Sequence, residues 1–166
     1  MSTETGQQPT WLTREASARL HEQLATMSGA TREDIVGRIA AAREEGDLKE
    51  NGGYHAAKEE QGKLEARIRQ LSALLRDAVT GDAPAGDTVQ QGSVVSVDYG
   101  DGDVERFLYA NRENATDEGS KIGELDVYSP ESPIGQALAG HRTGDSVTFG
   151  PRSITVTVVD VAPYQE

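Results

Sequence analysis

Two carboxylates three positions apart, Asp47 and Glu50, are the side chains of this 166-residue sequence best placed to do chemistry. If the backbone around them is helical, side chains at this spacing face the same way. Mg²⁺ keeps several of its waters and is usually held by one or two carboxylates plus ligands from elsewhere. The pair is therefore too small for an all-protein Mg²⁺ site. It could complete a metal site owned by another molecule, where two-metal chemistry needs a second ion and an oriented water.

The same spacing also has a purely structural interpretation. Asp47 could be a helix N-cap with Glu50 as its partner three residues later, which is the pattern of a capping box. The glycines that follow, Gly52 and Gly53, are equally ambiguous because each costs about 1 kcal/mol inside a helix. They mark either a loose turn or a place where something approaches the backbone closely. Spacing alone leaves these interpretations open.

The residues after the pair predict a long helix with one narrow apolar stripe. Seven positions alternate at spacings of three and four, which is an a/d seam over three heptads. They are Tyr54, Ala57, Gln61, Leu64, Ile68, Leu71 and Leu75, and Gln61 is the one polar member. At 1.5 Å per residue this helix should be roughly 35–40 Å long. It needs a partner helix to cover its seam.

The partner helix is predicted upstream, in a similar spacing of apolar residues. These are Leu12, Ala16, Leu20, Leu24, Met27, Ile35, Ile39 and Ala42. The spacing falters near residues 28–30, where we expect a turn or kink, and Thr31 with Asp34 resembles a capping box that restarts the helix. Residues 11–80 should thus form an antiparallel coiled-coil hairpin. Its turn, near residues 46–53, places the acidic pair at an exposed tip.

The second half of the chain follows a different period. Residues 81–90 read as a linker, and residues 91–166 contain segments with the period of two that β-strands show. These segments are residues 95–98, 107–109, 125–128 and 154–158. One short helix is predicted among them, with Ser132 as N-cap, Pro133 as its first residue and Gly140 as its end. The fold class is therefore α+β: a helical hairpin followed by a mostly antiparallel sheet with one helix.

Charge and composition limit the partners and the compartment. The net charge is −12, and it is uneven: residues 1–80 carry 11 basic and 13 acidic side chains, whereas residues 81–166 carry 5 and 15. A nucleic-acid surface is normally basic, so any RNA or DNA contact should fall to the first half. No cysteine is present, and no apolar run approaches a membrane span. We expect a soluble cytoplasmic protein without a membrane partner, with a flexible N-terminus at residues 1–10.

Other chemistry finds little support in the sequence. His21, His55 and His141 are scattered without the spacing of zinc ligands. There is neither a Gly-x-Ser-x-Gly elbow nor a phosphate-binding loop. No stable metal site and no bound cofactor are expected in the isolated protein.

The tip segment resembles the signature of the bacterial Gre transcript-cleavage factors, closest to the A type. The resemblance lies in residues 42–51, Ala-Arg-Glu-Glu-Gly-Asp-Leu-Lys-Glu-Asn, and continues from Tyr54 to Gln61. A second similarity, to the family's C-terminal segment, covers Ser132 to Gly140 and then Gly144-Asp145. Together the two matches span roughly residues 11–164 in the right order.

The resemblance implies an FKBP-like C-terminal domain that docks at the secondary channel of RNA polymerase, and a coiled coil that enters this channel. The tip pair, Asp47 and Glu50, would help the polymerase's own active site bind its second Mg²⁺ and a water. The polymerase would then cleave the 3′ end of backtracked nascent RNA, so the factor would not be an enzyme alone. A tip-support set is implied as well: Gly46, Leu48, Lys49, Asn51, Tyr54 and His55.

Several expectations remain alternatives. Ser132, Pro133 and Ile134 are candidates for the polymerase contact, and a monomer is expected because the hairpin satisfies its own seam. Many family members carry an acidic residue where this chain has Gly53, which leaves cleavage efficiency open. A channel-binding paralogue that inhibits polymerase without stimulating cleavage is therefore the second hypothesis. A coiled-coil scaffold with no role at the polymerase is the third.

Overall fold

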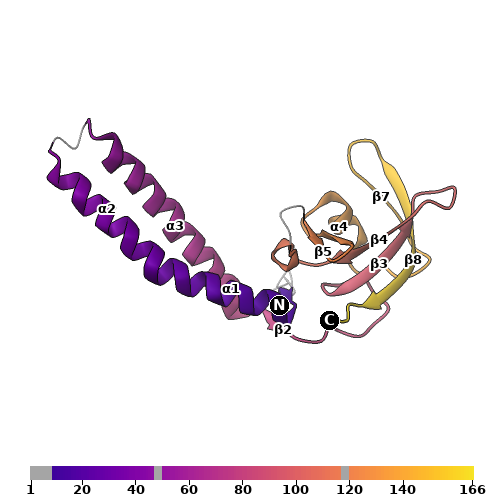
Figure 1. Ribbon diagram of the computed structural model, residues 1–166. Coiled ribbons are helices and arrows are strands. Elements are labelled where there is room, and N and C mark those ends of the chain that lie inside the picture. The colour runs from indigo at the N-terminus through magenta and orange to yellow at the C-terminus, as the bar shows by residue number, and fades with distance from the viewer. Residues whose placement is uncertain (1–8, 47–49, 117–119) are drawn as a thin grey trace, which may run out of the picture. The chain divides into compact units, whose positions relative to one another are not determined.

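The helical hairpin predicted from the seam is present in the computed structural model, which describes residues 9–46, 50–116 and 120–166 (Figure 1). The predicted flexible N-terminus falls mainly on residues 1–8, outside this range. The chain divides into two compact units. One is Ala18–Asp77, and the other combines the residues up to Ser17 with Ala78–Glu166.

The first unit is built on the predicted seam. Helix α1 spans Arg14–Thr26, α2 spans Arg32–Glu44 and α3 spans Gly52–Asp77, and α2 and α3 lie side by side in Figure 1. The 26 residues of α3 correspond to about 39 Å at 1.5 Å per residue. The core cluster of this unit consists of Ile35, Ile39, Ala57, Leu64 and Ile68, with Leu24, Met27 and Tyr54 packed against it. The seam prediction is confirmed, with Gln61 half-buried at its polar position.

The expected break between the first two helices is a π-helical turn. The segment Met27–Thr31 (η1) joins α1 to α2 in helical conformation, and Thr31 has φ −65° and ψ −44° with no side-chain cap bond. The predicted capping box of Thr31 and Asp34 is therefore wrong. A π turn holds more residues than an α turn, so it shifts the phase of the apolar stripe without ending the helix.

Ion pairs fix which residues of α2 face α3. The Arg32 guanidinium donates to both carboxylate oxygens of Glu65, at 2.8 and 2.9 Å. Arg38 donates to Glu60 and, at 3.2 Å, to Asp34. The hydrogen bond from Arg32 lowers the pKa of the Glu65 carboxyl. Exposed ion pairs usually add little stability, but the two-bond geometry of Arg32 and Glu65 is of the kind that does contribute. The same geometry selects one register of the two helices.

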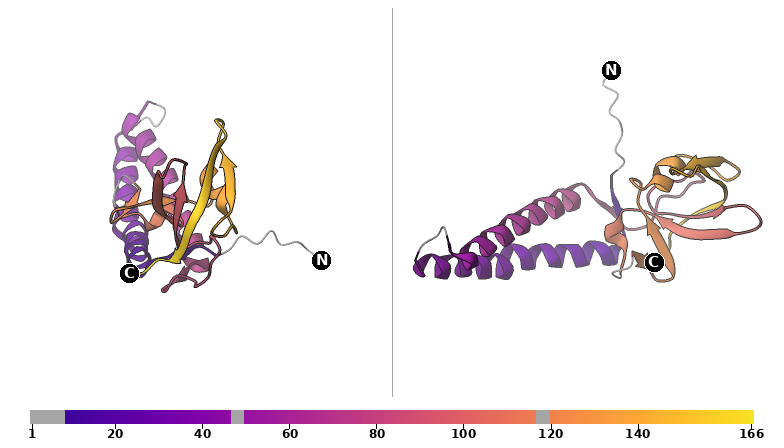
Figure 2. Two further views of the ribbon diagram at one scale, coloured as in Figure 1. Left: turned by 90° about the vertical axis from the view of Figure 1, so that its right-hand side faces the viewer. Right: turned by 90° about the horizontal axis from the view of Figure 1, so that it is seen from above.

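The second unit contains a six-stranded sheet in the order β5-β6-β4-β3-β8-β7. Its strands are β3 (Ser93–Asp98), β4 (Val104–Tyr109), β5 (Lys121–Ile122), β6 (Leu125–Tyr128), β7 (Ser146–Phe149) and β8 (Ile154–Pro163). All neighbours are antiparallel except β4 and β6. Figure 2 shows β8, in yellow, as a long strand of this sheet. The predicted fold class is confirmed. Strands β5 and β7 were not predicted, because they are short and contain polar residues. The closer likeness to FKBP stays a prediction.

Both faces of the sheet are buried over part of their area. One cluster lies beneath the short helix α4 (Pro133–Leu138) and includes Val95, Val97, Phe107, Leu138 and Val158. A second cluster gathers Trp11, Val94, Leu108, Ala110, Ile122 and Val127. Because side chains alternate along a strand, adjacent residues such as Val94 and Val95 serve different clusters. Across the described residues, no helix is long and apolar enough to cross a membrane.

A short N-terminal strand enters this second unit before the first helix. Strand β1 (Trp11–Leu12) pairs in parallel with β2 (Val79–Thr80), and the Trp11 indole donates to the Gly81 carbonyl at 3.0 Å. Leu12 therefore belongs to a strand, and the prediction that it begins the helical seam is wrong. Helix α1 begins after Thr13, whose hydroxyl accepts from Ala16 N at 3.0 Å as an N-cap.

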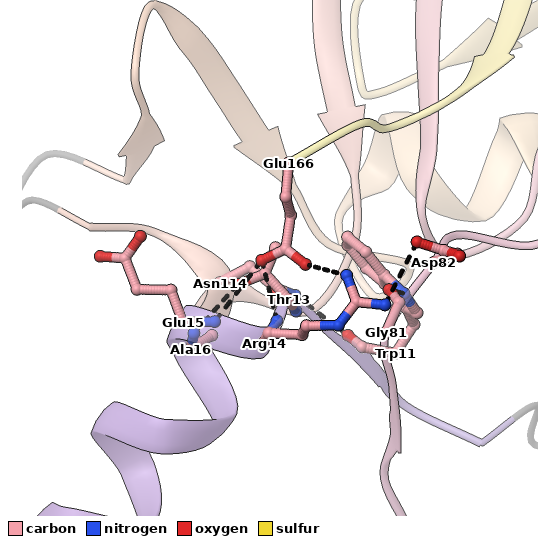
Figure 3. Close-up of polar contacts among 9 residues, drawn as sticks. All are labelled: Trp11, Thr13, Arg14, Glu15, Ala16, Gly81, Asp82, Asn114 and Glu166. Atoms are coloured by element: carbon pink, nitrogen blue, oxygen red, sulfur yellow. Dashed lines mark hydrogen bonds and ion pairs between the residues drawn. The ribbon is translucent and has the colours of Figure 1, made fainter.

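One buried asparagine holds this entry in place (Figure 3). Asn114 is fully buried in the short 3₁₀ helix η2 (Arg112–Asn114). Its Oδ1 accepts from Thr13 N at 2.8 Å, and its Nδ2 donates to the Trp11 carbonyl at 3.1 Å and to the Asn111 carbonyl at 3.0 Å. The two bonds to the entering strand, at Thr13 N and the Trp11 carbonyl, are buried and come from this one side chain.

The first turn of α1 is also bound from the far end of the chain. The Glu166 carboxylate accepts from Arg14 N at 2.9 Å and from the Arg14 guanidinium at 3.2 Å (Figure 3). Arg14 also reaches Asp82 at 3.3 Å. A carboxylate at a helix N-terminus is favoured by the helix dipole, so these contacts reinforce the anchor made by Asn114.

We expect Asn114→Ala to destabilise this unit by about 2–4 kcal/mol, because it leaves buried backbone groups without partners. Urea unfolding followed by fluorescence of the single tryptophan, the buried Trp11, measures the change. Arg112→Ala on the exposed side of η2 is the control, expected within about 0.5 kcal/mol of wild type. Equal effects from the two variants would contradict the anchoring role.

Candidate functional site at the hairpin tip

The tip is bounded by the end of α2 and the beginning of α3. Helix α2 ends with Glu45 N donating to the Ala42 carbonyl at 3.2 Å, and Gly46 follows with φ +117°. A positive φ suits glycine because it lacks a Cβ, so Gly46 lets the chain leave the helix axis. The predicted site residues Asp47, Leu48 and Lys49 lie outside the described residues.

Asn51 caps both helices at once. Its Oδ1 accepts from Tyr54 N at 3.1 Å, which makes it the N-cap of α3. Its Nδ2 donates to the Ala42 carbonyl at 2.7 Å, in the last turn of α2. The Asn51 carbonyl also accepts from His55 N at 3.1 Å, the first backbone bond at the start of α3. One side chain thus joins the two helix ends across nine positions of sequence.

The capping interpretation of the acidic pair is corrected by this geometry. Helix α3 begins at Gly52, so Glu50 precedes the N-cap and cannot be the third residue of the helix. Asparagine is as good an N-cap as aspartate, and Asn51 stands directly beside the helix. Glu50 is thereby released from a capping role and is exposed to solvent.

Contacts of aromatic side chains join the last turn of α2 to the first turn of α3. The Arg43 guanidinium lies 5.8 Å from the centre of the Tyr54 ring, within the range of a cation–π contact. The Tyr54 and His55 rings meet edge to face with centroids 5.6 Å apart. Tyr54 is half-buried against the hairpin core. These contacts place Tyr54 and His55 at the base of the tip, and their supporting role stays a prediction.

The described acidic side chains of the tip all face solvent. Glu44, Glu45 and Glu50 are exposed, and the described residues contain no group of three or more metal-ligating side chains. Among the described residues, no donor is bonded to these three carboxylates, so they are available as ligands. The arrangement suits the completion of a metal site whose other ligands come from a partner.

Gly52 and Gly53 are helical residues, so the loose-turn interpretation is wrong. They form the first turn of α3, and neither has a positive φ. A Cβ added at Gly53 would lie 3.4 Å from Asn51 Oδ1, and one at Gly52 would meet nothing within 4 Å. Both positions can therefore accept a side chain without backbone change.

Comparisons with known proteins agree with this arrangement along nearly the whole chain. Residues 10–79 match the family described as transcription elongation factor, N-terminal, and residues 83–163 match transcription elongation factor, GreA/GreB, C-term. The chain belongs to the GreA/GreB family of transcription elongation factors.

Individual relatives are similar over their full length. Transcription elongation factor GreA of Streptomyces coelicolor is 46% identical, covering 98% of both chains. GreA of Mycolicibacterium smegmatis is 50% identical over 97% of this chain and 99% of its own. Among solved structures, GreA factor homolog 1 (Gfh1) of Thermus thermophilus is 27% identical, with 93% of this chain and 99% of that chain covered and a TM-score of 0.43.

The second candidate surface of this GreA/GreB family member lies at the start of α4. Ser132 is the N-cap, as predicted: its hydroxyl accepts from Gly135 N at 3.1 Å and donates to the Ser129 carbonyl at 2.7 Å. Pro133 is exposed, whereas Ile134 is only 7% exposed and packs in the core beneath α4. Ile134 is apolar and faces the sheet, so it is removed from the candidate contact residues. Pro133 stays.

Gly135 is the residue here whose role was not inferred from the sequence. A Cβ on it would lie 2.0 Å from the Ser129 carbonyl oxygen, so no larger residue fits without moving the backbone. The Gly135 carbonyl in turn accepts from the Tyr109 hydroxyl at 3.1 Å. Burial raises the pKa of the Tyr109 hydroxyl, with the charge of Glu131 adding to the effect. The Pro-Ile-Gly order in the second matched segment was the available signal.

We expect Gly135→Ala to lower the free energy of unfolding of the second unit by about 2 kcal/mol or more, because it forces a backbone shift in a packed region. Trp11 fluorescence in a urea titration measures this. The same change at exposed Gly62 of α3, where a Cβ meets nothing, should stabilise the hairpin by about 1 kcal/mol. Circular dichroism reports that second effect, and a tolerated Gly135→Ala would refute the close approach.

Proposed function

We propose that this protein binds RNA polymerase through the secondary channel and stimulates the polymerase's own cleavage of backtracked RNA 3′ ends. In this proposal the factor works in the cytoplasm as a monomer and is not an enzyme alone. It lends carboxylates to an active site that belongs to the polymerase. The observation that carries the proposal is the hairpin tip, where Glu50 is exposed directly beside the residue that caps both helices.

The proposed role of the tip in metal binding depends on the charge and the exposure of its carboxylates. Mg²⁺ shared with the polymerase would supply the charge that activates water and stabilises the leaving oxygen. Asp47 and Glu50 would assist the binding of that ion and would orient its water by accepting a hydrogen bond from it. Because Glu50 is exposed, it can be desolvated by the partner's site at the moment of binding.

The rest of the hairpin supports delivery of the tip. The seam is buried within one chain, so the hairpin needs no second copy to cover its apolar residues. Exposed arginines and lysines along α2 and α3 can face RNA, whereas residues 81–166 are too acidic for this role. We assign polymerase docking to the second unit, at the exposed Pro133 and its neighbours.

One observation, the glycine at position 53, favours a second function, which is inhibition of polymerase without stimulation of cleavage. The glycine removes a side chain from the first turn of α3, at a position that can sterically accept one. If the tip needs a third acidic group, the factor would occupy the channel and inhibit polymerase without stimulating cleavage. The intact Asp47 and Glu50 favour cleavage.

The proposal predicts that wild-type protein accelerates RNA cleavage in purified backtracked complexes, and that Asp47→Ala and Glu50→Ala each reduce the acceleration about 10–100-fold. The loss should be greatest at low Mg²⁺, because the carboxylates assist metal binding. Competition with labelled wild type for core polymerase should give unchanged affinity. Binding of wild type without any gain in cleavage would establish the inhibitory alternative instead.

The Gly53 position separates charge from helix stability. Gly53→Glu and Gly53→Gln should each stabilise the hairpin by about 0.5 kcal/mol, since both replace a glycine in a helix. Only Gly53→Glu adds a carboxylate, so only it should raise cleavage at low Mg²⁺. Circular dichroism melts and cleavage rates measured side by side test this. If Gly53→Gln raises cleavage as much, the effect comes from flexibility and not from charge.

A further inference from the structure

The side chain of Asn51 does more than an N-cap requires. Capping α3 uses only an acceptor, which Oδ1 provides to Tyr54 N at 3.1 Å. Aspartate, serine or threonine could do the same. The donor half of the amide is used separately, on the Ala42 carbonyl at 2.7 Å. A serine hydroxyl can also donate while it caps a helix, as Ser132 does in α4, whereas an ionised aspartate has no donor. The amide of Asn51 supplies the donor and the acceptor on separate atoms.

The donor half ties the two ends of the tip together. The Ala42 carbonyl already accepts from Glu45 N at 3.2 Å, so Asn51 supplies its second, shorter bond. This bond fixes the backbone of residue 51 to the last turn of α2. The Arg43 guanidinium against the Tyr54 ring makes a second tie one residue further along α2. Closing a short connection at its base limits the conformations that its residues can adopt.

Glu50 is the described residue most affected by this closure. It directly precedes Asn51, so its backbone is one peptide away from the fixed point. Its side chain is exposed, which means that the direction of the carboxylate depends on the backbone behind it. A metal-assisting carboxylate loses effectiveness when its supporting contacts are removed.

We propose that Asn51 is a positioning residue for the tip: its amide N–H on the Ala42 carbonyl fixes the backbone from which Glu50 reaches the shared metal. This inference rests on the proposed cleavage function. It adds a division of labour within one side chain, with the oxygen serving helix α3 and the nitrogen serving the geometry of the acidic tip.

Asn51→Asp removes the nitrogen and adds a negative charge. The charge by itself would lower the half-saturating Mg²⁺ concentration, as expected for Gly53→Glu, so a rise reports the lost tie. The variant keeps an acceptor for Tyr54 N, and its charge suits a helix N-terminus, so the α3 cap is retained. It replaces the donor by an oxygen that repels the Ala42 carbonyl. Since a hydrogen bond contributes about 1 kcal/mol, the half-saturating Mg²⁺ concentration for RNA cleavage should rise about fivefold. The rate at saturating Mg²⁺ and the affinity for polymerase should change less than twofold.

Arg32→Gln is the matched control. It removes the two hydrogen bonds to Glu65 and so weakens the hairpin away from the tip. It should lower the hairpin melting temperature without changing the Mg²⁺ dependence of cleavage. If Arg32→Gln and Asn51→Asp shift the half-saturating Mg²⁺ equally, general hairpin stability explains the result and the positioning role is refuted. A lower half-saturating Mg²⁺ in Asn51→Asp, which is the effect of the added charge alone, refutes it as well.

A measurement on the isolated protein keeps this inference separate from the proposed function. In ¹⁵N relaxation experiments, Asn51→Asp should lower the order parameter of the Glu50 amide. Hydrogen exchange should leave the Tyr54 amide protected, because the cap remains. If wild type fails to stimulate cleavage but Glu50 loosens as expected, the proposed function fails and the structural tie stands. An unchanged Glu50 order parameter overturns the tie whatever the cleavage result.

Discussion

A hairpin of two helices has a single narrow seam to bury, and this constraint shapes the rest of the N-terminal unit. The seam of α2 and α3 holds small and medium apolar residues, so burial alone stabilises the pair modestly. Register, the phase of the apolar stripe and the connection at the open end are set by local features outside the seam. Arginine–glutamate pairs select the register, a π turn re-phases the stripe, and Asn51 closes the open end. The tip carboxylate Glu50 stays exposed because none of these contacts uses it.

The second unit, in contrast to the hairpin, has a large apolar core. Its sheet carries apolar clusters on both faces, so stability comes from packing, and the demanding positions are those where backbone meets backbone. Gly135 permits α4 to lie against the Ser129 carbonyl, and Asn114 satisfies the backbone of the entering strand β1. Both determine whether the elements around them can assemble.

In the proposed function, the two kinds of support suit two tasks, which are lending carboxylates at the tip and docking through the second unit. A tip that lends carboxylates must leave them solvated until a partner accepts them, and it must still limit where they point. A docking surface must be rigid before it meets its partner, since ordering side chains on binding costs affinity. Hydrogen bonds meet the first requirement at the tip, and apolar packing meets the second in the sheet unit.

The sequence alone determined the hairpin seam, the acidic tip, the capped helix at Ser132, four of the strands and the α+β class. These features follow from periodicity and from local capping chemistry, which act over a few residues. The tertiary structure decided the rest. It made Asn51 the cap of α3, placed Leu12 in a strand and buried Ile134. It also brought the Ser129 carbonyl against Gly135 and bonded Asn114 to the entering strand. Each of those outcomes depends on a group brought close by folding from elsewhere in the chain, and no local pattern records such a distance.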